Sequence, residues 1–287
     1  MRYLLIEHDT VYDYGNPVIL LQHRLLLRPR EGRDIHVETA ELRIAPAHRL
    51  RWQRDAYDNA LAVVDFLEPA RRLAIGSRVG LRHYQDRPLD FVVAEYAVYF
   101  PFQYPARERI DLGPYLPPVF GQDSAAVGAW LEQFWRVGQV VETYLLLDRI
   151  NKAIAIGFVY QPREEPGVQS PATTLARRAG SCRDFATLFI DACHWLGLAA
   201  RFVSGYLYEP TPIPAAGATH AWAEVYLPGA GWRGFDATSG QVVGDRHIAV
   251  AVHRHPEAVS PVTGAFTAVS PESPVMQVAV KVAEIAG

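Results

Sequence analysis

Three residues of this sequence combine a thiol, an imidazole and a carboxylate: Cys182, His220 and Asp236. A thiolate is a strong nucleophile, an imidazole exchanges protons near neutral pH, and a carboxylate fixes the tautomer of an imidazole beside it. Together these groups can attack a carbonyl carbon and form a covalent acyl-enzyme. The sequence therefore indicates nucleophilic catalysis by Cys182, if the fold brings the three side chains together.

The thiol lies at the predicted beginning of a helix over residues 182–196, which Gly197 ends. The apolar side chains at helical spacing are Phe185, Leu188, Phe189, Ala192, Cys193 and Leu196. Unpaired backbone N–H groups and the macrodipole at a helix N-terminus favour an anion, so the Cys182 thiolate is favoured over the thiol. Cys193, on the apolar face, is expected to be buried and inert.

The imidazole and the carboxylate lie on two predicted strands. Alternation over residues 220–226 places His220 and Trp222 on one face, and the next segment ends in Asp236. Two adjacent strands of one sheet can therefore point His220 and Asp236 at the end of a helix packed beside them.

Three sequence blocks carry a family resemblance: Gly-x-Cys-Arg-Asp-Phe-Ala at 180–186, His-Ala-Trp-x-Glu-Val at 220–225 and Gly-Phe-Asp-x-Thr at 234–238. They resemble the core of the transglutaminase-like superfamily, the papain-related thiol enzymes, and in particular the bacterial members with an N-terminal β domain. Ala237 departs from the proline that the family often has after the aspartate. The resemblance implies an α+β fold in which an antiparallel β domain precedes a papain-like core, with Cys182, His220 and Asp236 as the catalytic triad.

Residues around the triad are expected to support it. Asp184 stabilises the first helical turn through the dipole but opposes thiolate formation, an effect that Arg183 offsets. Trp222 is the third supporting residue. The oxyanion of an acyl-transfer intermediate needs the backbone N–H of Cys182 and one further donor, which the sequence leaves open among Tyr160, Gln161 and Trp222.

Composition places the chain among ordinary globular proteins. It has 287 residues, enough for two domains, with 49% hydrophobic and 21% charged residues. A net charge of −3 gives no electrostatic reason to expect a nucleic acid or an anionic membrane as partner. Two cysteines argue against a disulfide framework, and the N-terminal residues lack the apolar core of a signal peptide, so we expect a cytoplasmic protein.

The order of patterns predicts two domains, an N-terminal β-rich domain over residues 1–120 and a catalytic domain with a C-terminal β extension over 121–287. Strands are predicted at 3–8, 22–27, 36–44, 61–67 and 77–84, and later at 198–208, 247–252 and 274–285. A proline-rich passage over 100–118 marks the linker. Helices are predicted at about 123–136 and 141–155, with a short one beginning at Ser170-Pro171.

No pattern indicates a metal or a cofactor. Asp245, His247, His253 and His255 are too irregularly spaced for a metal site, and no clustered acidic loop of the calcium-binding kind occurs. We therefore expect a reaction without a cofactor.

The favoured function is hydrolysis of amide or peptide bonds in a protein or peptide substrate. A second interpretation is transglutaminase-type transfer to an amine, which requires an apolar tunnel that excludes water. The aromatic residues considered for such a tunnel are Trp195, Trp222, Tyr226 and Trp232. A third is a non-catalytic peptide-binding scaffold, for which a damaged triad would be expected, and a fourth is acetyl transfer to a small molecule, for which the sequence shows no nucleotide-binding signal.

Overall fold

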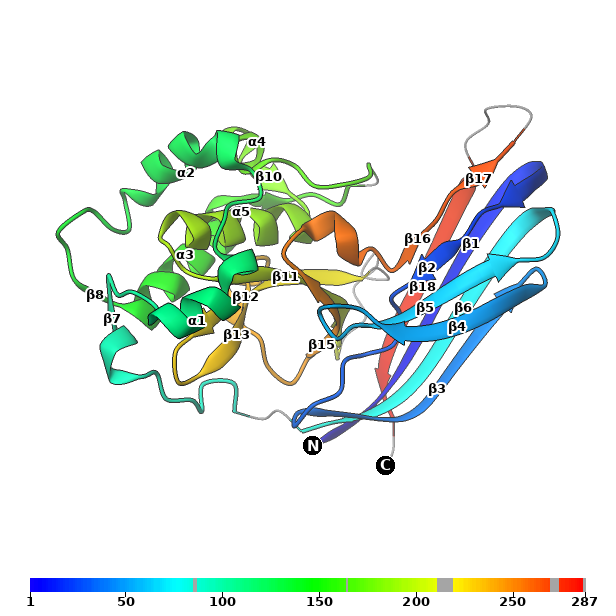
Figure 1. Ribbon diagram of the computed structural model, residues 1–287, viewed down its shortest axis with the longest axis horizontal. Helices are drawn as coiled ribbons and strands as arrows, with labels where there is room; N and C mark the ends of the chain where they lie inside the picture. The colour runs from blue at the N-terminus through cyan, green and yellow to red at the C-terminus, as the bar shows by residue number, and fades with distance from the viewer. Residues whose placement is uncertain (85–86, 164, 211–218, 269–273, 286–287) are drawn as a thin grey trace.

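The computed structural model of the chain describes residues 1–84, 87–163, 165–210, 219–268 and 274–285. Two parts lie side by side: a layered β structure, and a compact arrangement of helices around a second β-sheet (Figure 1). Most strand pairs are antiparallel, and the predicted α+β fold class is confirmed.

The β domain consists of two sheets that share a core. In the first, β1 pairs with β6, β17 and β18, and β6 pairs with β3; the second has the order β16-β2-β5-β4. The strand bounds are β1 (Arg2–Leu20), β2 (His23–Leu25), β3 (Ile35–Ala45), β4 (His48–Arg54), β5 (Ala60–Phe66), β6 (Ala70–His83), β16 (Val262–Thr263), β17 (Phe266–Thr267) and β18 (Val275–Glu284). Leu25 and Val64 of the second sheet pack in one cluster with Leu73 and Ile75 of the first, so the two sheets bury their apolar faces against each other.

The last strands of the chain return to this β domain. β18 pairs with β1 in a register that runs from Leu4 opposite Glu284 to Asp13 opposite Val275, and β16 pairs with β2. The sequence pattern places these residues in a C-terminal extension of the catalytic domain, whereas their strands extend the N-terminal sheets. A period-two pattern predicts a strand but does not name the strand that it pairs with.

The segment after the β domain packs against the second part. β7 (Tyr99–Phe100) pairs with β8 (Val141–Glu142), and α1 (Ala106–Asp111) follows β7. Tyr104 and Leu112 form a small cluster with Ala199. The stretch just before residue 120, predicted as part of the N-terminal domain, therefore contacts the second part of the molecule.

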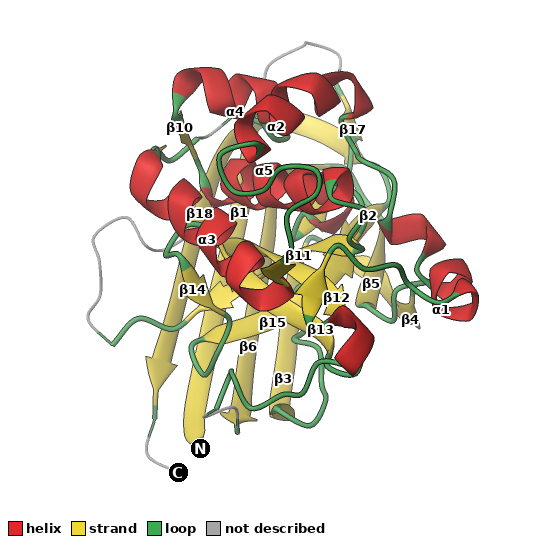
Figure 2. Cartoon of the chain, turned by 90° about the vertical axis from the view of Figure 1, so that its left-hand side faces the viewer, coloured by secondary structure: helices red, strands yellow, loops and turns green. Residues whose placement is uncertain are grey.

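The second part is built around one buried helix, α5 (Cys182–Trp195). Its sheet has the strand order β14-β13-β12-β11-β15, with β11 (Ala200–Leu207), β12 (His220–Leu227), β13 (Gly231–Asp236), β14 (Gln241–Val242) and β15 (His247–His253). α5 contacts β11 and β12 and is covered by α2 (Ser124–Leu131), α3 (Thr143–Gly157) and α4 (Pro171–Arg177) (Figure 2). The parallel pair β9 (Val159–Tyr160) and β10 (Ala179–Gly180) leads the chain into α5.

Most predicted elements occur within a few residues of their expected positions. α5 ends before Gly197, which has a positive φ of 76°, and the Ser170 hydroxyl accepts the Thr173 N–H at the start of α4. α2 is shorter than predicted, and β4 was missed because Leu50 and Trp52, its two apolar residues, are exposed and lie among three arginines. No helix in the described part of the chain is long and apolar enough to cross a membrane.

Candidate active site

Cys182 is the first residue of α5, as the sequence predicted. In that position its backbone N–H has no partner within the helix, and the thiol lies where the helix dipole favours an anion. Cys182 is 8% exposed. The Cys182 side chain is therefore mostly buried at the start of the helix.

Asp184 fixes the turn that presents Cys182. Its fully buried carboxylate accepts the backbone N–H and the hydroxyl of Ser181, the backbone and side-chain N–H groups of Gln169, and the guanidinium of Arg163 at 2.8 Å. Burial opposes its ionisation, but these hydrogen bonds hold the pKa of Asp184 below its ordinary value. A side chain at Gly180 would come within 2.9 Å of the Asp184 Cβ, which explains the glycine there.

The cation that pairs with Asp184 differs from the expected one. Arg163 forms the ion pair, whereas the Arg183 guanidinium donates to the backbone carbonyls of Arg163 and Glu165. Arg183 points away from Asp184 because successive helical side chains face different directions. Arg183 therefore stabilises the segment before α4, whereas Arg163 offsets the negative charge of Asp184.

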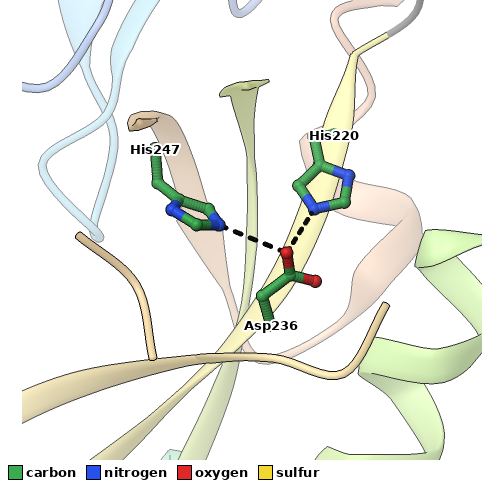
Figure 3. Close-up of side chains that lie close together, drawn as sticks. All are labelled: His220, Asp236 and His247. Atoms are coloured by element: carbon green, nitrogen blue, oxygen red, sulfur yellow. Dashed lines mark hydrogen bonds and ion pairs between the residues drawn. The ribbon is translucent and has the colours of Figure 1, made fainter. Parts of the chain in front are cut away.

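His220 and Asp236 lie at neighbouring strand ends and face each other. His220 is the first residue of β12, Asp236 is the last residue of β13, and His220 Nε2 donates to Asp236 Oδ2 at 3.0 Å (Figure 3). The thiol of Cys182 hydrogen-bonds to the same imidazole. Because Nε2 is engaged by Asp236, Nδ1 is the nitrogen left for the sulfur. The structure thus brings the three predicted triad residues together.

Both members of the His220–Asp236 pair favour their charged forms. Burial lowers the pKa of His220, but hydrogen bonds and negative charge from Asp236 and Cys182 outweigh it and raise the pKa to about 10. Burial likewise opposes ionisation of Asp236, yet hydrogen bonds from His220 and His247 lower the pKa of Asp236 well below its usual range. An imidazolium held by a carboxylate is the partner that a thiolate requires.

His247, a residue that the sequence pattern does not assign to the site, contacts the same carboxylate. Its Nε2 lies 3.2 Å from Asp236 Oδ2, and its side chain is 5% exposed (Figure 3). It is the first residue of β15, which pairs with β11 and not with the strands that carry His220 and Asp236. Only this strand order, which the sequence does not reveal, brings His247 to the site.

The His220, Asp236 and His247 side chains also form a possible metal-ligand set, with their ligand atoms within 4.8 Å of one another. A metal on His247 Nε2 requires an unprotonated Nε2 and therefore a proton on Nδ1. Nδ1 instead accepts the backbone N–H of Gly244 at 3.4 Å. This donor arrangement fits a hydrogen-bonded cluster better than a metal site.

The three residues considered as oxyanion donors occupy different surroundings. The Tyr160 hydroxyl hydrogen-bonds to Cys182, and burial together with the nearby sulfur raises the pKa of Tyr160 to about 12, so it remains a donor. Trp222 is 1% exposed and packs edge-on against His247, with ring centroids 5.2 Å apart. Gln161 is exposed, and its backbone N–H donates to the Gly180 carbonyl. Tyr160 is therefore the best placed of the three.

Two family models match this chain. Residues 4–81 match the bacterial transglutaminase-like N-terminal region, and residues 138–237, which include Cys182, His220 and Asp236, match the transglutaminase-like superfamily. A protein of unknown function from Mycobacterium tuberculosis is 30% identical over 311 residues, covering 98% of this chain and 93% of that relative. The chain belongs to the transglutaminase-like superfamily.

Further similarities of this transglutaminase-like protein agree with the assignment. A relative of unknown function from Mycobacterium bovis has the same 30% identity and covers 98% of this chain and 93% of its own length. The crystal structure of a candidate cysteine protease from Cytophaga hutchinsonii matches with a TM-score of 0.75 at 18% identity, covering 100% of this chain and 91% of that one. This likeness shows a shared fold over both the β domain and the catalytic half. Membership of the superfamily supports a thiol-dependent enzyme.

Proposed function

We propose that this transglutaminase-like protein hydrolyses amide or peptide bonds in a protein or peptide substrate through an acyl-enzyme on Cys182. The observation that carries the proposal is the position of His220, which is hydrogen-bonded to Asp236 through Nε2 and to the Cys182 thiol on its other side. This is the geometry in which a proton can pass between the sulfur and the imidazole.

In the first half of the reaction the Cys182 thiolate attacks the amide carbonyl carbon. The C–N bond then breaks, and the His220 imidazolium gives its proton to the leaving amine. Asp236 holds the imidazole in place and stabilises its positive charge through the 3.0 Å hydrogen bond. The product of this half is a thioester on Cys182 and a free amine.

In the second half the neutral His220 takes a proton from water, and the resulting hydroxide attacks the thioester carbonyl. The C–S bond breaks, the acid product leaves, and the thiolate–imidazolium pair is restored. The oxyanion formed in both halves is held by the backbone N–H of Cys182 and the hydroxyl of Tyr160, which already contacts the sulfur.

The positions of the aromatic residues support water as the acceptor. Trp195 lies thirteen residues after Cys182 on α5, or about 20 Å along the helix. Tyr226 and Trp232 pack against each other near the ends of β12 and β13 that lie about 20 Å from His220. Trp222 packs behind the two histidines. Trp195, Tyr226 and Trp232 therefore lie too far from the site to line an amine tunnel that ends at the sulfur.

The test is a panel of glutamine-containing and other short peptides, offered with and without a labelled primary amine in the presence of a chelator. We expect cleavage or deamidation to exceed amine incorporation, and chelation to have no effect. Amine incorporation above hydrolysis would establish transglutaminase-type transfer with the same triad. If no peptide is turned over, and Cys182→Ala binds the same peptides as the wild type, the protein is a binding scaffold.

A further inference from the structure

His247, which hydrogen-bonds to Asp236, lies outside the part of the chain that matches the superfamily model, which ends at residue 237. The histidine is buried, and its Nε2 is directed at the same carboxylate oxygen that binds His220 (Figure 3). A buried imidazole in this position restricts the orientation of the carboxylate.

The surroundings of His247 fix both its tautomer and its ring plane. Because Nδ1 accepts the Gly244 N–H, the neutral ring carries its proton on Nε2 and donates it to Asp236 Oδ2. The indole of Trp222 lies edge-on to the ring, with an interplanar angle of 77°. His247 is therefore a fixed donor toward Asp236.

The remaining donors to Asp236 come from the turn that directly follows it. The Ser239 hydroxyl donates to Oδ2 at 2.8 Å, and the Thr238 N–H donates to Oδ1 at 2.9 Å. Because both donors belong to the same turn as Asp236, these contacts position the carboxylate only relative to that turn. His247 is different because it reaches the carboxylate from a separate strand, β15, on the opposite edge of the sheet from β14.

The β domain holds this strand in place. β15 is an edge strand of the sheet that carries His220 and Asp236. Residues of the β domain form hydrogen bonds with backbone groups on the edge of β15 that does not pair with β11. The contacts are His83 Nε2 to the His247 carbonyl at 3.0 Å, the Arg30 N–H to the Ala249 carbonyl at 2.8 Å, and the Asn59 side chain to both the N–H and the carbonyl of Val252 at 2.9 Å. The backbone of His247 is therefore anchored independently of the triad.

We propose that His247 is a positioning residue, which holds the Asp236 carboxylate in the orientation that pairs it with His220. The proposal rests on the proposed function, because the pairing matters only if Cys182 and His220 exchange a proton. Besides Asp236, the titratable groups that face this cluster are Cys182 of α5, Tyr160 of β9, His220 of β12 and His83 of β6.

The experiment measures the alkylation rate of Cys182 against pH in the full-length protein, with mass spectrometry to identify the labelled peptide. The variants are His247→Leu, which removes the donor; His247→Gln, whose amide N–H reaches the place of Nε2; and His247→Asn, whose amide is too short. His253→Leu is the matched control, because His253 lies on the same strand but packs against Tyr57, with ring centroids 4.2 Å apart.

Without the donor at position 247, the Asp236 carboxylate can rotate away from His220. The His220 imidazolium is then less stable, and the Cys182 thiolate is less favoured. For the Leu and Asn variants we expect the alkylation rate at about pH 6 to fall roughly tenfold or more relative to the wild type. For the Gln variant and for His253→Leu we expect rates within about threefold of the wild type, since a positioned donor remains.

The outcomes separate this inference from the proposed function. A wild type that does not react at pH 6 removes the proposed function itself. A wild type that reacts, with unchanged alkylation rates at pH 6 in the Leu and Asn variants, overturns the role of His247, as does an equal loss in the Gln and Asn variants. Should the Leu variant fail to fold, the comparison of Gln with Asn decides the question.

Discussion

Helix α5 carries a cysteine near each end, and each cysteine lies close to a buried His–Asp pair. At the start of the helix, Cys182 contacts His220, which is paired with Asp236. Toward its end, Cys193 is fully buried near Asp191, which is paired with His194 through Oδ1 and Nδ1 at 3.3 Å. The same residue types therefore occur twice on one helix, in different arrangements.

What differs is the partner of the second imidazole nitrogen. His194 Nε2 faces the carbonyl of Ala200 at 3.2 Å, and Asp191 also accepts the backbone N–H groups of Val119 and Phe120. All of these partners are backbone groups, so the His194–Asp191 pair stabilises the surrounding backbone. His220 offers its second nitrogen to a thiol that can give up a proton. A His–Asp pair becomes catalytic machinery when one imidazole nitrogen is left for a reacting group.

The largest expected effect separates the two cysteines. Cys182→Ala should lower kcat by about 10⁵–10⁶-fold, because the covalent step is lost. Cys193→Ala should leave kcat within about threefold of the wild type and cost about 1–2 kcal/mol of unfolding free energy through the small cavity that it leaves. Peptide turnover and urea unfolding measure the two quantities. A comparable loss of turnover in both variants would contradict the assignment of the nucleophile.

Substitution of the two aspartates should likewise affect different properties, turnover for Asp236 and stability for Asp191. Asp236→Asn should lower kcat by roughly 10³–10⁴-fold, since the amide stabilises neither the tautomer nor the charge of His220. Asp191→Asn should cost about 3–5 kcal/mol of stability, because a buried hydrogen-bonded pair is broken, while the folded fraction keeps its kcat. Kinetics normalised to folded protein, together with denaturant unfolding, distinguish these effects; a reversed pattern would exchange the roles of the two pairs.

Stability should depend on pH through His220. Its pKa is raised from 6.5 to about 10 in the folded protein, so its stabilising contribution is fully present below pH 6.5 and is lost as the pH rises through 10. The Tm should therefore fall between pH 7 and 10, and this fall should be shallower in His220→Gln. Thermal unfolding followed by circular dichroism measures it, and parallel curves for the two proteins would refute the contribution of His220.

The smallest effect compares the two arginines near the first turn of α5. Arg163 pairs with the buried Asp184 at 2.8 Å, whereas Arg183 donates to backbone carbonyls on the preceding segment. Arg163→Met should cost about 1–3 kcal/mol, since Asp184 keeps its other donors, and Arg183→Met less than about 1 kcal/mol. Urea unfolding of both variants gives the order, and a larger loss for Arg183→Met would contradict the pairing described.

The sequence reveals the local parts of this site better than its long-range parts. The helix start at Cys182 and the strand ends at His220 and Asp236 follow from helical spacing, alternation and glycine stops, which depend on neighbouring residues. His247 could not be found in this way, because its contact with Asp236 depends on the pairing of β15 with β11. That pairing places β15 and β13 in the same sheet although two other strands separate them. Arg163 was missed for a similar reason, since it lies 21 residues before Asp184.

The β domain shows the same limit. Alternation predicts β1, β3, β5 and β6, but in β4 it extends over only Leu50 and Trp52, and nothing local indicates that β18 pairs with β1. Strand pairing between chain ends is decided by the burial of whole sheet faces, which a window of residues does not contain.

Selective alkylation tests the central claim, that Cys182 is an activated thiolate and Cys193 an inert core residue. Burial and the charge of Asp191 raise the pKa of Cys193 well above its ordinary value, whereas Cys182 lies beside an imidazole that favours its charged form. Iodoacetamide at about pH 6, followed by mass spectrometry of the two cysteine peptides, should label Cys182 well before Cys193, and His220→Gln should slow the labelling of Cys182 at that pH. Equal labelling rates in the wild type, or earlier labelling of Cys193, would contradict the account.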